Sequence, residues 1–234
     1  MSRPSLSLDV RRKVYETLIT FSATLEGVED LCKADYTELL VQKSGAEDDR
    51  IKPLTLQLLY NVLRQPNGES LRLAQKCGAI NTSTDLLKSD SPLVREKAAL
   101  TLTALTLTDA GKQFAIKAQT LHFLVPLLKD PNWKVRANAA GGIMSICIDD
   151  EGKNIALDQK APEFLIQLLR DPERFVRLNA VKAISAVCPH PEARKRFQEG
   201  KGCIEWLTVM VDDESDELLS RSARIARDTV QWEP

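Results

Sequence analysis

The sequence is poor in the residues that build β-sheet proteins. Aromatic residues make up only 5% of the 234 residues, and there are only 10 glycines and 11 prolines. Sandwiches and barrels need many β-branched and aromatic positions separated by turns, whereas this chain is rich in Leu, Ala, Lys and Glu. The composition therefore favours an all-α protein.

The chain also lacks an excess of charge and any long apolar segment. It has 32 Lys and Arg residues against 33 Asp and Glu residues, which gives a formal net charge of -1. This balance provides no general attraction to a polyanion, so we expect no nucleic acid partner. No segment approaches the roughly 18 uncharged apolar residues that a membrane span needs, and the first nine residues lack the apolar core of a signal peptide. We therefore expect no membrane span or anchor.

Residues typical of enzymes and metal sites are scarce. The only histidines, His122 and His190, lie far apart in the sequence, so a paired general-base or zinc role has no local support. The motifs H-E-x-x-H, G-x-S-x-G and G-x-G-x-x-G are absent. We therefore expect no catalysis, no cofactor, no metal and no small-molecule substrate. The cysteines are odd in number and contain no C-x-x-C pair, which predicts free thiols in a reducing compartment. They are Cys32, Cys77, Cys147, Cys188 and Cys203.

The most informative feature of the sequence is an internal repeat. Three segments align without a gap, at an offset of about 41 residues, through a Leu-Leu pair, a Val-Arg pair and an Ala. These positions are Leu86-Leu87, Leu127-Leu128 and Leu168-Leu169; Val94-Arg95, Val135-Arg136 and Val176-Arg177; and Ala98, Ala139 and Ala180. Gly111-Lys112 recurs as Gly152-Lys153, which assigns this pair to the scaffold rather than to a phosphate loop.

Each unit is predicted to form a short, a medium and a long helix. In the clearest copy these span Gly152–Gln159, Ala161–Leu169 and Glu173–Val187. Pro162 suits the first turn of the medium helix, and Pro172 separates it from the long helix. Three helices in about 41 residues are typical of armadillo and HEAT repeats. The sequence thus predicts an all-α, armadillo/HEAT-like right-handed helical solenoid of about five repeats with degenerate ends.

We expect this solenoid to be a single domain over residues 1–234. In its N-terminal part we expect helices at Val10–Ala23 and Tyr36–Gln42, followed by a loop over Lys43–Asp49. The predicted parts are an N-terminal helical cap at 1–47, a degenerate repeat at 48–78, regular repeats at 79–119, 120–160 and 161–201, and a C-terminal cap repeat at 202–234.

The repeated arginine and its aspartates have a predicted structural role. Arg95, Arg136 and Arg177 lie about 100° around the long helix from the repeated valine, at the edge of the buried face. There they come within reach of Asp130, Asp171 or a carboxylate of a neighbouring repeat. We expect an Arg-Asp ladder that ties the repeats together, and the alternative is a ligand-binding stripe. By the same reasoning Cys147 and Cys188, at matched positions, are predicted to be packed thiols.

The opposite face of the long helices is the predicted protein-binding surface, because stacked repeats make it a continuous concave wall. Small residues on it either leave room for a partner segment or merely permit tight packing. Importin-like proteins carry Trp and Asn ladders on this face, which are missing at Leu100 and Ala104, so nuclear-import cargo is not expected. The candidate binding residues are Lys97, Thr101, Asn138, Gly141, Ser145, Asn179 and Lys182.

The C-terminal half resembles the radial spoke head protein 14 family. The resemblance extends from about Leu121 to Pro234 and is carried by five segments: 127–131, 135–141, 151–153, 175–183 and 221–226, with Trp232 near the end. It implies a non-catalytic armadillo subunit of the axonemal radial spoke in motile cilia or flagella, bound to other radial spoke or axonemal proteins. The usual chain of that family is longer. The alternative is a soluble cytosolic adaptor that binds peptide segments of signalling or trafficking partners.

Overall fold

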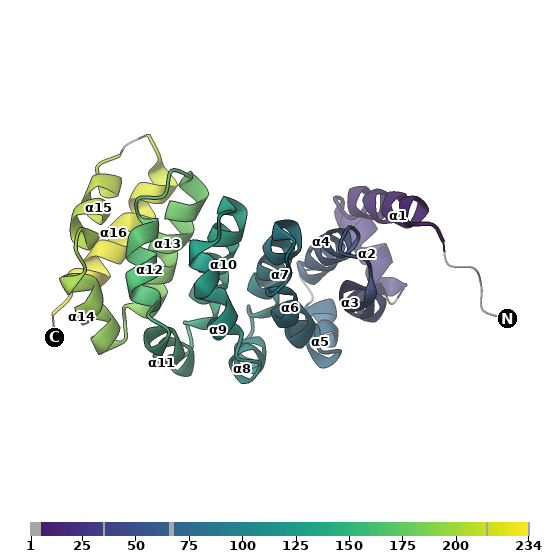
Figure 1. Ribbon diagram of the computed structural model, residues 1–234, viewed down its shortest axis with the longest axis horizontal. Helices are drawn as coiled ribbons and strands as arrows, with labels where there is room; N and C mark the ends of the chain where they lie inside the picture. The colour runs from purple at the N-terminus through teal and green to yellow at the C-terminus, as the bar shows by residue number, and fades with distance from the viewer. Residues whose placement is uncertain (1–5, 35, 66–67, 214, 234) are drawn as a thin grey trace. The chain divides into compact units, whose positions relative to one another are not determined.

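A computed structural model describes residues 6–34, 36–65, 68–213 and 215–233, and these residues are helical throughout apart from their loops (Figure 1). They form sixteen α-helices and one 3-10 helix. The helices cluster into two compact units, residues 1–105 and 106–234, so the boundary falls within the predicted repeat 79–119. In the described part of the chain, no helix is long and apolar enough to cross a membrane.

In the first unit, α4 packs between α1 and α7. Its apolar residues fill the core, with Leu56, Leu58 and Val62 fully buried. The helices of this unit are α1 (Leu8–Phe21), α2 (Leu25–Lys33), α3 (Tyr36–Ala46), α4 (Lys52–Leu63), α5 (Glu69–Lys76), α6 (Ala79–Leu86) and α7 (Pro92–Leu105).

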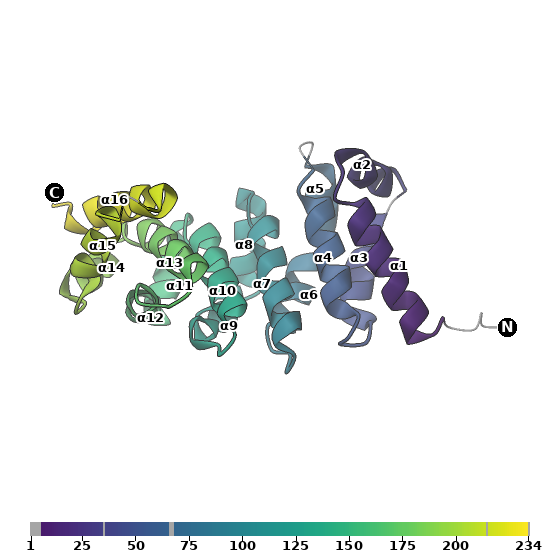
Figure 2. The same ribbon diagram turned by 90° about the horizontal axis from the view of Figure 1, so that it is seen from above.

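The second unit repeats the order short, medium, long three times. The long helices α10, α13 and α16 lie side by side in this order, as Figure 2 shows from above. The helices are α8 (Asp109–Lys117), α9 (Thr120–Leu124), the 3-10 helix η1 (Pro126–Lys129), α10 (Trp133–Ile146), α11 (Asp150–Asp158), α12 (Ala161–Leu168), α13 (Arg174–Val187), α14 (Pro191–Glu199), α15 (Cys203–Val211) and α16 (Glu217–Gln231).

The repeated positions of the sequence are the core of each unit. The side chains of Val94, Val135 and Val176 are fully buried, and so are Ala98, Ala139 and Ala180. Each buried valine contributes about 1.5–3 kcal/mol relative to an exposed one. Cys147 and Cys188 are also fully buried, which confirms that they are packed thiols.

The Gly-Lys pair has a local structural explanation. A Cβ atom on Gly152 would lie 2.6 Å from the carbonyl oxygen of Ile146, so only glycine lets α11 approach the end of α10 this closely. The Nζ of Lys153, a largely buried side chain, donates to the carboxylate of Asp150 at 2.6 Å and to the carbonyl of Ile148 at 3.3 Å. The pair therefore belongs to the scaffold, as the repeat predicts.

Two predictions for the N-terminal part are wrong. The loop expected over Lys43–Asp49 is helical as far as Ala46, because Ser44 is buried and its hydroxyl donates to the carbonyl of Leu40 within α3. The sequence analysis also missed α2. That helix buries only Gly27, Val28 and Leu31, which is too few apolar positions to make its period recognisable.

Candidate functional site

The Arg-Asp ladder forms at Arg136. Its Nε donates to Oδ2 of Asp171 at 2.7 Å, and its Nη1 donates to the carbonyls of Asp130 and Pro131 at 2.9 and 3.1 Å. Both charged side chains are largely buried, and the charge-assisted bond links α10 to the turn that precedes α13. The other carboxylate oxygen of Asp171 accepts the backbone N–H of Glu173, which shapes that turn.

The repeated arginines share a second role, which the sequence analysis did not predict. Each uses Nη1 to bind two carbonyls of the turn before its own helix. Arg95 binds those of Ser89 and Asp90 at 2.8 and 3.0 Å, and Arg177 binds those of Asp171 and Pro172 at 2.8 and 2.9 Å. The arginines therefore fix the angle between the medium and long helices of one repeat.

At the next step of the ladder the ion pair comes from a different arginine. Arg174, at the start of α13, binds the carboxylate of Asp216 through both Nε and Nη2. The Arg174 guanidinium lowers the pKa of Asp216, which also caps α16 by accepting the N–H of Leu219. Among the described residues, no carboxylate forms a hydrogen bond with Arg177, so the prediction that Arg177 supplies this contact is wrong.

Three of the predicted protein-binding residues are buried, so the prediction is wrong for them. Thr101 donates to the carbonyls of Leu56 and Lys97, Ser145 exchanges hydrogen bonds with Thr106, and Gly141 lies in the packed part of α10. Neighbouring long helices approach closely through these small residues, so their faces meet a helix rather than a partner. The alternative of tight packing holds for Thr101, Gly141 and Ser145.

The other four predicted residues are partly exposed. These are Lys97, Asn138, Asn179 and Lys182. The Nδ2 of Asn179 donates to the carbonyl of Ala137 at 2.8 Å and thereby joins α13 to α10, so part of its amide is already in use. The ammonium of Lys97 lies 3.0 Å from the carboxylate of Glu96. These positions can contact a partner only through the part of each side chain that remains accessible.

The exposed face extends one helical turn further toward the N-termini than predicted. Phe175 is 56% exposed and lies four residues before Asn179, on the same side of α13. Its ring stacks on that of Trp133 at the start of α10, with 6.4 Å between centroids and 13° between planes. Lys134 and Arg174 lie 5.6 and 5.4 Å from the centroids of Trp133 and Phe175.

The same positions on α16 carry exposed apolar residues. Leu218 is 49% exposed and Ile225 is 57% exposed, and these residues follow the register of Phe175 and Lys182 on α13. Counting one residue back from the repeated valine would have identified this row, because that position lies four residues before the first one considered. We define the long-helix face of the second unit as Trp133, Lys134, Asn138, Phe175, Asn179, Lys182, Leu218, Ser222 and Ile225.

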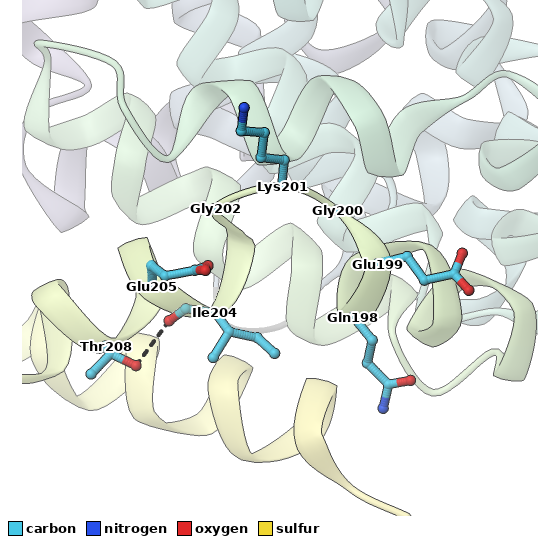
Figure 3. Close-up of a pocket in the computed structure, with 8 residues that line it drawn as sticks. All are labelled: Gln198, Glu199, Gly200, Lys201, Gly202, Ile204, Glu205 and Thr208. Carbon is cyan, nitrogen blue, oxygen red and sulfur yellow. Dashed lines mark hydrogen bonds between the residues drawn. The ribbon is translucent and has the colours of Figure 1, made fainter.

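A hollow of about 510 Å³ lies at the turn between α14 and α15 (Figure 3). Lys201 extends away from Gln198 and Ile204, and the hydroxyl of Thr208 donates to the carbonyl of Ile204. The amide of Gln198 donates to the carbonyl of Val230, so it holds α14 against α16. This arrangement brings no acid and base together and serves helix packing.

The histidines and cysteines do not converge either. His190 caps α14 by accepting the N–H of Ala193 at its Nδ1, while His122 is exposed on α9. Burial raises the pKa of Cys188 to about 11 and that of Cys203 to about 12. In the described part of the chain, no group of three His, Cys, Asp or Glu residues is placed to hold a metal ion.

Repeated triplets with equivalent core, capping and ladder positions define an α-helical repeat protein. A model of HEAT repeats matches residues 80–185 and 121–226, which together cover more than half of the chain. The chain therefore belongs to the HEAT-repeat family. A search of curated proteins gives no match.

Solved structures confirm the fold class, an all-α solenoid of the armadillo/HEAT type. An engineered protein is 21% identical with a TM-score of 0.86, over 97% of this chain and 92% of its own. A designed armadillo repeat protein is 22% identical with a TM-score of 0.85, over 97% and 96%. Another, solved in complex with the peptide (KR)4, is 21% identical with a TM-score of 0.82, over 97% and 95%.

Proposed function

We propose that this protein is a non-catalytic scaffold that binds segments of other proteins through the long-helix face of its second unit. The observation that carries the proposal is the row of exposed apolar residues at equivalent positions of α10, α13 and α16, with Trp133 stacked on Phe175. Large aromatic side chains dominate the energetics of protein interfaces, because each buries much area on binding. Partly exposed amides such as Asn179 add polar contacts beside them.

The charge of this face favours an acidic and apolar partner. Lys134 and Lys182 flank the aromatic pair, and Arg174 lies against Phe175. A designed armadillo neighbour was solved with the basic peptide (KR)4. That neighbour supports a peptide-binding role for the fold, but the lysines here would repel such a peptide. A segment with apolar residues and carboxylates complements the surface.

Within this class we propose a structural role in the axonemal radial spoke of motile cilia or flagella. The resemblance of residues 121–234 to the radial spoke head protein 14 family supports this assignment, which implies other spoke proteins as partners and the axoneme as location. The alternative is a cytosolic adaptor that binds its partners transiently. Extraction of axonemes separates the two: a spoke subunit stays with the doublets through detergent and leaves in strong salt, whereas an adaptor leaves with detergent.

The binding face is tested by comparing two exposed phenylalanines. Phe175→Glu should reduce capture of cross-linked partners from ciliated cells by about tenfold or more, since it places a charge in the aromatic pair. Phe114→Glu, at a residue of similar exposure on α8, is the matched control and should not change capture. Melting temperatures of both variants are measured alongside. Equal capture by the two variants would refute the proposed face.

A further inference from the structure

The second unit contains two equivalent steps between repeats, and their contacts differ in one place. At the first step, Nζ of Lys129 lies 3.8 Å from the ring centroid of Phe164. At the second step, the guanidinium of Arg170 lies 5.0 Å from the ring centroid of Trp206. The cation and the ring occupy equivalent positions on the medium helices in both steps. The two steps can therefore be compared residue by residue.

The carboxylates of the two steps are also equivalent. Oδ1 of Asp171 accepts the N–H of Glu173 at 3.0 Å, and Oδ1 of Asp213 accepts the N–H of Ser215 at 3.0 Å. At the first step, Asp171 also receives Nε of Arg136. At the second step, Asp213 has no such bond to Arg177 in the described structure. The repeat thus builds the arginine and the carboxylate a second time without joining them.

A pocket of about 540 Å³ lies where this contact is missing. Arg177 and Asp213 both line it, together with Trp206, Val209 and Met210 of α15. Val209 is 58% exposed, so the apolar wall is open to solvent. The guanidinium of Arg177 is already held through Nη1 by two carbonyls of its own turn, as in Arg136.

We propose that this pocket binds a carboxylate side chain from an acidic segment of a partner protein, with the Nε edge of Arg177 as its donor. The bond between Arg136 and Asp171 is the template, since the same arginine geometry there binds a carboxylate of the chain itself. An arginine that is already held loses little freedom on binding, which favours association. Apolar residues next to the incoming carboxylate then contact Trp206 and Val209.

The surrounding charges define the segment more narrowly. Arg170 adds a second cation, and the charge of Asp171 is balanced by Arg136. Asp216 lies near Arg177 but is bound on both oxygens by Arg174. Asp213 is the one lining carboxylate that opposes the ligand, so a single acid between apolar residues fits better than a run of acids.

This inference rests on the proposed function as a protein-binding scaffold, but it concerns a surface separate from the long-helix face. The probe is the peptide N-acetyl-Leu-Glu-Leu-amide, and its control is the same peptide with Gln in place of Glu. Nitrogen-15 NMR follows the Nε–H signals of arginine in the full chain. The Glu peptide should shift the Nε–H signal of Arg177 and leave that of Arg136, whose Nε is already bonded, unchanged. The Gln peptide should shift neither.

Asp213→Asn provides a second measurement that does not depend on changing Arg177. It should tighten binding of the Glu peptide about two- to fivefold, because it removes the opposing charge. If Asp213→Asn moves the Arg177 signal without peptide, Asp213 already closes the pocket in solution and the proposal is overturned. Equal shifts with both peptides, or none at millimolar concentration, overturn it as well. If the pocket fails while Phe175→Glu still abolishes capture, the proposed function stands without it.

Discussion

The start of the medium helices offers the sharpest test of how the repeat shapes the backbone. In the described repeats a residue with left-handed backbone precedes α6, α9, α12 and α15. The residues are Gly78 (φ 81°), Gln119 (φ 55°), Lys160 (φ 61°) and Gly202 (φ 83°). Only two of the four are glycine, so the fold holds Gln119 and Lys160 in a conformation that L-residues avoid. We predict that Lys160→Gly stabilises the protein and that Gly78→Ala destabilises it.

The magnitude follows from two opposing terms. A left-handed conformation costs a residue with a side chain about 1–2 kcal/mol. Glycine gives up about 0.4–1 kcal/mol of this advantage through its greater freedom in the unfolded chain. Lys160→Gly should therefore raise the free energy of unfolding by about 0.5–1 kcal/mol, and Gly78→Ala should lower it by a similar amount. Gly78 isolates the backbone term, because a Cβ there would meet no atom within 4 Å.

Urea unfolding followed by circular dichroism measures both changes as shifts of the midpoint at constant slope. In a thermal melt they correspond to shifts of about 1–4 °C for a chain of this length. The control is Asn154→Gly, at an exposed position inside α11, which should destabilise by up to about 1 kcal/mol as glycine does in an ordinary helix. If Lys160→Gly destabilises the protein as Asn154→Gly does, the left-handed conformation carries no strain and the reasoning is wrong.

Two further predictions concern the core. Gly152→Ala should destabilise by about 2 kcal/mol or more in the same urea assay, because its Cβ would lie 2.6 Å from a backbone oxygen that cannot move independently; a change below 0.5 kcal/mol would contradict this. At pH 8 a thiol reagent should modify Cys32 and Cys77, which are partly exposed, and should reach Cys147, Cys188 and Cys203 only after unfolding. Because folding raises the thiol pKa of Cys188 and Cys203 from 9.0 to about 11 and 12, their contribution to stability is complete below pH 9 and is lost as the pH rises toward these values, so the melting temperature should fall between pH 9 and 11.

The core was predictable because its signal is local and repeated. Val135, Val176 and the alanines four residues later are buried in every copy, since a helix with one apolar stripe has a single way to face its neighbours. The period of the sequence thus indicates the fold class without any knowledge of long-range contacts. The short helix α2 lacks this redundancy, and for that reason it was missed.

The exposed face was less predictable, because it depends on what the neighbouring helix covers. A helical wheel treats Thr101, Gly141 and Ser145 as one open stripe, yet each lies against packed backbone or a neighbouring hydroxyl. The interhelical distance between long helices is set by their small residues, and one helix alone does not reveal it. Phe175 escaped notice for a simpler reason, since the count began at the valine after it.

The ladder shows how a change in loop geometry redirects a contact. Asp171 and Asp213 form the same local turn, but α16 begins with Asp216 as its cap, and Arg174 binds this carboxylate instead. Arg177 keeps its two carbonyl contacts and loses the ion pair that its equivalent makes. No sequence pattern within one repeat distinguishes these outcomes, because both depend on the path of the following loop.

These departures separate stability from recognition in a chain built of equal units. Contacts that recur in every copy, such as the buried valines or the arginine bonds to turn carbonyls, are explained by packing alone. Phe175 and Arg177 depart from that pattern and carry the two candidate surfaces. They are two residues apart on α13, which places them about 200° apart around the helix. One short segment cannot occupy both sides, so a partner that uses both surfaces must wrap around the first turn of α13 or present two separate segments.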